Sequence, residues 1–183
     1  MTLWKSAKKF DCTIVRAAEN CLINELLHTR IMYTISTEKS RLDVDMIHRY
    51  LSEESYWAKN IPRALVERAI DNSLCFGAYD ERGAQAGFAR IVTDFAVFAY
   101  IGDVFVLPAH RGRGVSKLLM RAIREHPSLQ ELRRWYLLTD DAHALYEQFG
   151  FHALEDPRRH MEISVKKPYP RPADREPRTA GSD

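Results

Sequence analysis

The chain has 183 residues, of which 45% are hydrophobic, 28% charged and 10% aromatic. This composition excludes collagen-like, low-complexity and wholly disordered proteins, and the length fits little more than one globular domain of roughly 150 residues. The net charge is +2, but residues 33–165 alone hold 17 basic and 19 acidic residues, a poor match to the strongly basic face that nucleic-acid binding requires. We therefore expect no nucleic-acid partner, and any anion site must be local.

The sequence also predicts where the protein resides. Its longest apolar run, 95–101, is far shorter than the roughly 18 residues of a membrane span. Acidic residues interrupt the first 27 positions, where a secretion signal would lie. The three cysteines are odd in number and lack metal-ligand spacing. We expect a cytoplasmic protein with reduced thiols and no membrane partner.

The two ends of the chain differ from its middle. Apolar residues recur at helical spacing over 12–28, which predicts an amphipathic helix in an N-terminal extension, residues 1–32. Residues 166–183 hold half of the eight prolines and almost no apolar side chains, which predicts a flexible tail. The main domain is expected at 33–165. The oligomeric state stays open, since an edge strand or the N-terminal helix could form a homodimer surface.

Strands and helices alternate along the middle of the chain. Strands are expected at 33–36, 74–79, 85–93, 99–107, 134–138 and 161–165. Helices are expected after Asp43 or Asp45 as a cap, after Pro62, and at 114–125 and 141–149. The hairpin at 74–93 predicts antiparallel strands, and the strand–helix–strand order near the end predicts a parallel pair. The fold class is therefore a mixed α/β sheet.

The segment 102–117, GDVFVLPAHRGRGVSK, carries the clearest chemistry. An apolar strand ends at Pro108, and a turn with two glycines leads directly into a helix. The amides at a helix start have no internal partner and carry partial positive charge, so they favour anions. The alternative is an ordinary turn with solvated basic side chains. A P-loop string is absent, and Lys117 stands where a dinucleotide fold needs its third glycine.

The string 111–116, RGRGVS, resembles the Q/R-x-x-G-x-G/A acetyl-CoA motif of the GNAT superfamily of N-acetyltransferases. The lead-in at 104–108 and the segment 139–151, TDDAHALYEQFGF, resemble the same family. The likeness covers roughly 33–165 and is strongest over 101–151. It implies a mostly antiparallel mixed sheet, with a parallel pair between the fourth and fifth strands, flanked by helices. Two residues depart from the pattern: Ser116 replaces Gly/Ala, and Asp141 stands where many members carry Asn.

The resemblance implies a role for each matching position. The backbone of Val104, Phe105 and Val106 would pair with the pantetheine amides of acetyl-CoA as an added strand does. The turn and helix start would hold the pyrophosphate, and Asp141 would bind the cofactor arm. Tyr146 would protonate the departing thiolate as a general acid, or else be an ordinary core aromatic. The pyrophosphate residues are Arg111, Gly112, Arg113, Gly114, Val115, Ser116 and Lys117.

The acceptor must also lose a proton. A lysine-like amine with a pKa of about 10.4 is neutral in only about one part in 2,500 at pH 7. Asp103, a lone acid in an apolar strand, is the best candidate base, because burial would raise its pKa toward a useful value. The favoured alternative is an acid at the strand start that hydrogen-bonds to a neighbouring turn. Asp94, Glu53 and Glu54 are weaker candidates. In the family, the region 52–60, with Tyr56 and Trp57, commonly walls the acceptor site.

The resemblance implies acetyl transfer from acetyl-CoA to a primary amine. Direct attack by the amine is expected, since neither Cys75 nor any serine sits in a nucleophile turn. The acceptor, a small molecule or a peptide, stays open. The seven histidines form no zinc-binding pair on a helix, so no metal is expected. The alternatives are a non-catalytic module that senses acyl-CoA and, more remotely, a nucleic-acid binder acting through the basic ends.

Overall fold

A computed structural model describes residues 32–165 and Tyr169. The predicted N-terminal helix at 12–28 and most of the predicted tail at 166–183 lie outside the described residues. No helix in the described part is long and apolar enough to cross a bilayer.

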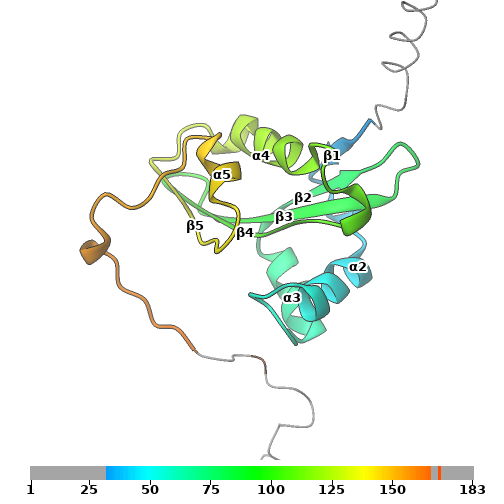
Figure 1. The fold of residues 1–183 in the computed structure, drawn as a ribbon, viewed down its shortest axis with the longest axis horizontal. Coiled ribbons are helices and arrows are strands. Elements are labelled where there is room, and N and C mark those ends of the chain that lie inside the picture. The colour runs from blue at the N-terminus through cyan, green and yellow to red at the C-terminus, as the bar shows by residue number, and fades with distance from the viewer. Residues whose placement is uncertain (1–31, 166–168, 170–183) are drawn as a thin grey trace, which may run out of the picture. The chain divides into compact units, whose positions relative to one another are not determined.

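Five strands form one sheet in the order β1-β2-β3-β4-β5 (Figure 1). Strands β1 to β4 pair antiparallel, and β4 pairs parallel with β5. The mixed sheet and its parallel last pair, both predicted from the sequence, are confirmed. The strands are β1 (Thr34–Ser36), β2 (Leu74–Tyr79), β3 (Gln85–Thr93), β4 (Phe98–Val106) and β5 (Arg134–Leu137).

Helices begin where the sequence supplies caps. Helix α2 starts after Asp43, whose carboxylate accepts the amide of Met46 at 2.9 Å, and continues as a π-helical turn, Tyr50–Glu54. Helix α3 follows Pro62, and α4 follows Gly114. The helices are α2 (Val44–Arg49), α3 (Arg63–Asp71), α4 (Val115–Glu125) and α5 (His143–Glu147). Short 3-10 turns lie at Lys39–Arg41, Pro108–His110, Pro127–Leu129 and Pro157–Arg159.

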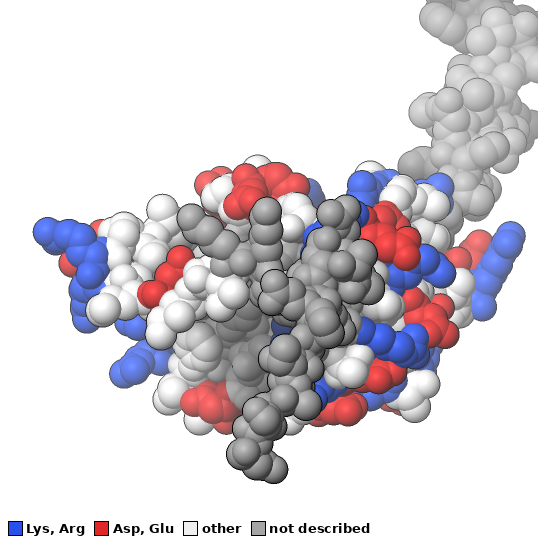
Figure 2. All heavy atoms as spheres, turned by 90° about the horizontal axis from the view of Figure 1, so that it is seen from below, with Lys and Arg blue, Asp and Glu red and all other residues white. Residues whose placement is uncertain are grey.

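The sheet separates two hydrophobic clusters. Helices α4 and α5 pack on one face, and α2 and α3 lie on the other (Figure 1). Alternation along the strands divides the side chains: Ile101 joins the α4 cluster, whereas Phe105 joins the α2–α3 cluster. On the face seen in Figure 2, basic and acidic side chains are mixed around the undescribed atoms, with no continuous basic patch in view.

The α4 face supplies a direct test of the core. Leu119 is fully buried beneath the sheet, so Leu119→Ala should lower the free energy of unfolding by about 2–5 kcal/mol, because the deletion removes apolar burial and leaves a cavity. Urea denaturation measures this. Arg121→Ala, on the exposed side of the same helix, should stay within about 0.5 kcal/mol. Equal effects at both positions would contradict the packing.

A β-bulge changes the register of β4. Between the pairs Phe88–Phe105 and Arg90–Gly102, β4 contains one residue more than β3. Asp103 lies in the bulge with a positive φ of 51°, a conformation that side-chain-bearing residues rarely adopt. Pairing with β5 ends at Ile101–Leu137. Within the described residues, β4 therefore has no strand partner on its β5 side from Gly102 to Val106.

Two predicted elements differ from the structure by more than one residue at an end. The helix expected at 141–149 is shorter, His143–Glu147. The strand expected at 161–165 is wrong, because no strand lies beside this segment in the described chain and it has no strand assignment. The side chains of Met161 and Ile163 are 98% and 100% exposed. Apolar alternation specifies a strand face, but only pairing with a neighbouring edge makes a strand.

Candidate active site

The turn before α4 has the backbone geometry of an anion site. Gly112 and Gly114 have positive φ angles of 73° and 80°, and a β-carbon at either would meet no atom within 4 Å. The first bond into α4 runs from the amide of Leu118 to the carbonyl of Gly114 at 3.0 Å. The amides of the first three helical residues therefore have no acceptor within the helix, and an anion can reach them without obstruction.

Eleven of the thirteen predicted site residues line one hollow of about 540 Å³ between the end of β4, the start of α4 and α5. They are Val104, Phe105, Val106, Arg111, Gly112, Gly114, Val115, Ser116, Lys117, Asp141 and Tyr146. The two that do not line this hollow are Asp103 and Arg113. The fold thus gathers the glycine turn and the segment 141–146, some thirty residues apart in the sequence, around one cavity. The unpaired side of β4, at Val104, Phe105 and Val106, forms part of its wall.

Arg111 lies across part of this wall. Its Nε donates to the carbonyl of Val106 at 3.1 Å, and its terminal nitrogen donates to the hydroxyl of Tyr50 at 3.0 Å. A ligand that pairs with the Val106 carbonyl would therefore have to displace or share this contact. Arg113, by contrast, is exposed in the turn, where its charge can act on a bound anion only through solvent or a change of rotamer.

Tyr146, from α5, lines the same hollow. It is 8% exposed, and its ring meets Phe151 edge-on at 6.0 Å between centroids. Burial, followed by the neighbouring Tyr56, Asp141 and Tyr100, raises the pKa of Tyr146 to about 12. The phenol therefore keeps its proton at neutral pH, which a general acid requires.

Asp103 faces the opposite side of the sheet from α4. Its Oδ2 accepts Nε of Arg90 at 2.6 Å, and its Oδ1 accepts Nε1 of Trp57 at 3.0 Å. The carboxylate is not the isolated acid that the strand sequence indicated, because it forms an ion pair whose two side chains are 15% and 18% exposed. Asp103 lines a second hollow under α3, and Trp57 lines both hollows.

Several residues of the hollow were not among the predicted site residues. Tyr50 stacks on Phe105 with ring centroids 3.9 Å apart and forms part of the wall. The only sequence signal for Tyr50 was its place on the inward face of a helix, which indicates core rather than site. His110 also lines the hollow, and its Nδ1 hydrogen-bonds with the Tyr33 hydroxyl at 2.9 Å.

The weaker candidate bases lie elsewhere. Asp94 accepts the amides of Ala96, Val97 and Phe98, each at 3.0 Å, which lowers its pKa and gives it a role in closing the β3–β4 hairpin. Glu53 and Glu54 are exposed and line neither hollow. In the described part of the chain, no three His, Cys, Asp or Glu side chains come together as a metal site.

Comparison with known proteins places this geometry in a family. A model of the acetyltransferase (GNAT) domain matches residues 71–153. A crystal structure of an acetyltransferase assigned to the GNAT family, from Xanthomonas campestris pv. campestris, is 54% identical, and the match covers 75% of this chain and 96% of that one with a TM-score of 0.73. The chain belongs to the GNAT family of acetyltransferases.

Other relatives of this GNAT protein are more distant. A protein of Gibberella zeae named as an acetyltransferase is 33% identical over 139 residues, which covers 64% of this chain and 77% of that protein. Glucosamine-6-phosphate N-acetyltransferase of Arabidopsis thaliana is 14% identical with a TM-score of 0.52, covering 74% of this chain and 98% of that one. At this identity the second likeness shows the fold alone. The family model, the Gibberella protein and the Xanthomonas structure support acetyl transfer as the general activity class.

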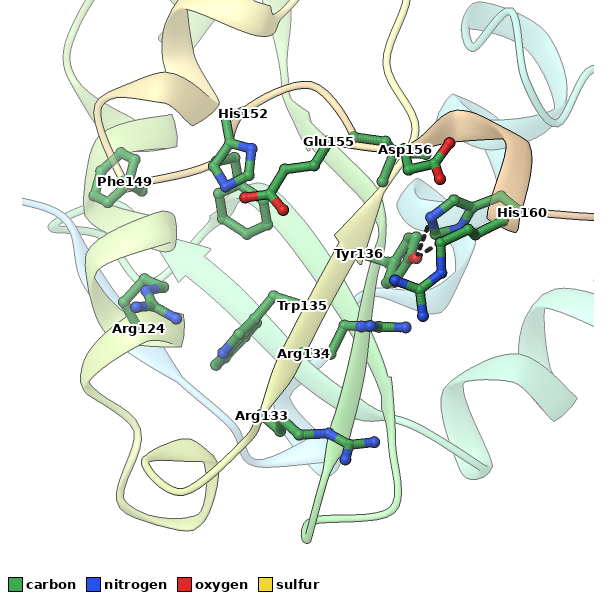
Figure 3. Close-up of a pocket in the computed structure, with 14 residues that line it drawn as sticks. Arg124, Arg133, Arg134, Trp135, Tyr136, Phe149, His152, Glu155, Asp156 and His160 are labelled. Atoms are coloured by element: carbon green, nitrogen blue, oxygen red, sulfur yellow. Dashed lines mark hydrogen bonds between the residues drawn. The ribbon is translucent and has the colours of Figure 1, made fainter.

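The GNAT chain has a further hollow, of about 610 Å³, beyond β5 (Figure 3). Four arginines and several aromatic rings line it, and Arg124 lies over the ring of Trp135 at 4.7 Å. Tyr136 bonds to His160 across it at 2.7 Å. None of the predicted site residues contributes to this cavity, so it is separate from the candidate active site.

Proposed function

We propose that the protein is an N-acetyltransferase that moves the acetyl group of acetyl-CoA to a primary amine by direct attack. The observation that supports this is the hollow at the end of β4, in which an unpaired strand edge, a glycine turn with outward amides and a protonated phenol come together. The strand edge would pair with the amides of the cofactor arm, the turn would bind the diphosphate, and the phenol would protonate the sulphur of the thioester.

The residues present fit acetyl-CoA. The free side of β4 near Val104 offers backbone donors and acceptors to the amides of an extended arm. The amides of Val115, Ser116 and Lys117 offer donors to a diphosphate, with Arg111 and Lys117 supplying formal charge. Ser116, which departs from Gly/Ala, has a small side chain and is partly buried in the helix start. Asp141 can only accept hydrogen bonds when ionised.

Acetyl-CoA supplies the activated acetyl group. A nitrogen–carbon bond forms as the carbon–sulphur bond breaks, so the nitrogen loses one proton and the sulphur gains one. Tyr146 holds a proton in the lining of the hollow and would donate it to the sulphur. Because its pKa of about 12 lies well above that of an ordinary thiol, near 8.5, the phenolate left by this transfer is a strong base and regains its proton from water readily. Asp103 is the proposed proton acceptor on the amine side.

The experiment that tests this function measures free thiol released from acetyl-CoA across a panel of primary amines. Amine-dependent release is expected, together with an N-acetylated product of matching mass. Binding of acetyl-CoA without release for any amine would instead support the alternative function, a module that senses acyl-CoA. Absence of both binding and release at millimolar acetyl-CoA would refute the proposal as a whole.

Direct attack makes a prediction about Cys75. This thiol is 1% exposed, and burial raises its pKa to about 11, so it holds little thiolate at neutral pH and lines neither hollow. Cys75→Ala should keep kcat within about twofold of the parent. A route through an acyl-cysteine at this position would instead abolish turnover in a folded variant, which circular dichroism would establish.

A further inference from the structure

A second hollow, under α3, adjoins the candidate active site and is lined by Asp103, the proposed proton acceptor for the amine. It has about 630 Å³, within the ~300–1,000 Å³ of small-molecule pockets. Trp57 lines both this hollow and the one at the end of β4. Asp103, which lines the second hollow, directly precedes Val104, which lines the first. The two hollows therefore adjoin each other at Trp57 and at the bulge of β4.

One end of this second hollow carries paired charges. Arg90 and Asp103 lie side by side, and Arg90 also donates to the hydroxyl of Ser73 at 3.2 Å. The bulge in β4 turns Asp103 toward this hollow in a strained conformation, which persists because two donors hold the carboxylate. Arg68 adds a second guanidinium to the lining.

The rest of the lining is mostly apolar. Ile61, Leu65 and Ala69 contribute from α3 and the residues before it, and Phe88 and Val92 contribute from β3. Among the residues that the structure describes, Asp103 is the only acidic one in the lining, which also includes Asn72 and Ser73. The hollow therefore offers one carboxylate beside one guanidinium, a second guanidinium, and a mostly apolar remainder.

This pattern is complementary to a zwitterion with an apolar body. An ammonium can approach Asp103 while an adjacent carboxylate approaches Arg90, so that each charge of the protein pair stays compensated. A simple amine would compete with Arg90 for Asp103 and leave the guanidinium without its partner. The carboxylate of the ligand therefore distinguishes the two kinds of amine, and the apolar lining favours an aliphatic or aromatic side chain.

We propose that the acetyl acceptor is a free α-amino acid with an apolar side chain, bound in the hollow under α3. This rests on the proposed N-acetyltransferase function. The ammonium held near Asp103 first loses one proton through Asp103 to water, and the neutral nitrogen then attacks the acetyl carbon. As the carbon–sulphur bond breaks, the nitrogen loses a second proton by the same route, the sulphur takes a proton from Tyr146, and Tyr146 regains one from water. The product is an N-acetyl amino acid, which no longer carries the ammonium that Asp103 binds and so leaves.

The test compares amines that differ only by the carboxylate: leucine against 3-methylbutylamine, and phenylalanine against 2-phenylethylamine. Thiol release from acetyl-CoA should give each amino acid a kcat/KM at least tenfold above that of its partner. In Arg90→Gln this preference should fall below threefold through a rise in KM for the amino acid. Arg63→Gln, which removes an arginine ion-paired with Asp45 and Glu67 outside the hollow, should keep the preference.

Equal or reversed preference in the parent protein would overturn this inference while leaving the N-acetyltransferase function intact. Binding of CoA without turnover of any amine would overturn both. If Arg90→Gln does not fold, Arg90→Lys is the substitute, because it keeps the charge and removes the forked guanidinium. Its preference for the amino acid over the simple amine should fall between the tenfold of the parent and the threefold expected for Arg90→Gln. An unchanged preference in a folded Arg90 variant would assign carboxylate recognition elsewhere and so contradict the proposal.

Discussion

Tyr146→Phe is expected to lower kcat at least tenfold while changing the affinity for CoA by less than about twofold. A positioned acid typically contributes about 10²–10⁴ in rate, and the variant removes only the hydroxyl from a ring that stays packed against Phe151. Steady-state kinetics and calorimetric titration with CoA measure the two quantities. Tyr136→Phe, which removes a hydroxyl bonded to His160 outside the site, is the matched control and should keep full rate.

The pH dependence gives an independent check on the same residue. Because burial raises the pKa of Tyr146 to about 12, the protonated acid persists well above the ordinary tyrosine value near 10. The rate should therefore rise as the amine loses its proton, without a fall centred at pH 10. Full activity in Tyr146→Phe would show that this tyrosine is not the general acid, whereas a fall at pH 10 that the variant lacks would show that its pKa is not raised.

The second large effect is expected at Gly114. Gly114→Val should weaken CoA binding at least tenfold, because a branched side chain would project from the turn into the approach to the helix amides. The positive φ of 80° adds backbone strain of roughly 1–2 kcal/mol. Calorimetric titration with CoA measures the loss of affinity, and thermal unfolding measures the loss of stability that the strain causes.

Gly83 provides the matched control for this strain. It has the same φ of 80°, also with no atom within 4 Å of a β-carbon, but lies in the turn between β2 and β3. Gly83→Val should lower the melting temperature about as much as Gly114→Val and leave CoA affinity unchanged. If both variants lose affinity equally, the loss reflects stability and the glycine turn does not bind the diphosphate.

Local patterns predicted the elements whose partners are close in the sequence. The strands 74–79 and 85–93 match β2 and β3 residue for residue, because a short polar turn joins two apolar runs and leaves one pairing available. The segment 161–165 failed for the opposite reason. Its alternation of apolar and polar residues is typical of a strand, but a strand also needs a neighbouring edge, which no local pattern specifies.

The candidate site likewise has features that the sequence could predict and features that it could not. The glycine turn could be predicted because a strand, a turn and a helix start lie next to one another in the sequence. The ion pair of Asp103 with Arg90 could not, since it depends on the register between β3 and β4 and on the bulge that shifts it. Trp57 comes from a third segment, and only the folded chain shows that it borders both hollows.

The most direct measurement is a titration with CoA followed by the backbone amide resonances of the ¹⁵N-labelled protein. If the turn and helix start hold the diphosphate, the signals of residues 112–117 will move most and saturate together with those of 104–106 along the free side of β4. Saturating shifts confined to other regions, such as the arginine-lined hollow beyond β5 (Figure 3), or a spectrum unchanged at millimolar CoA, would contradict the site.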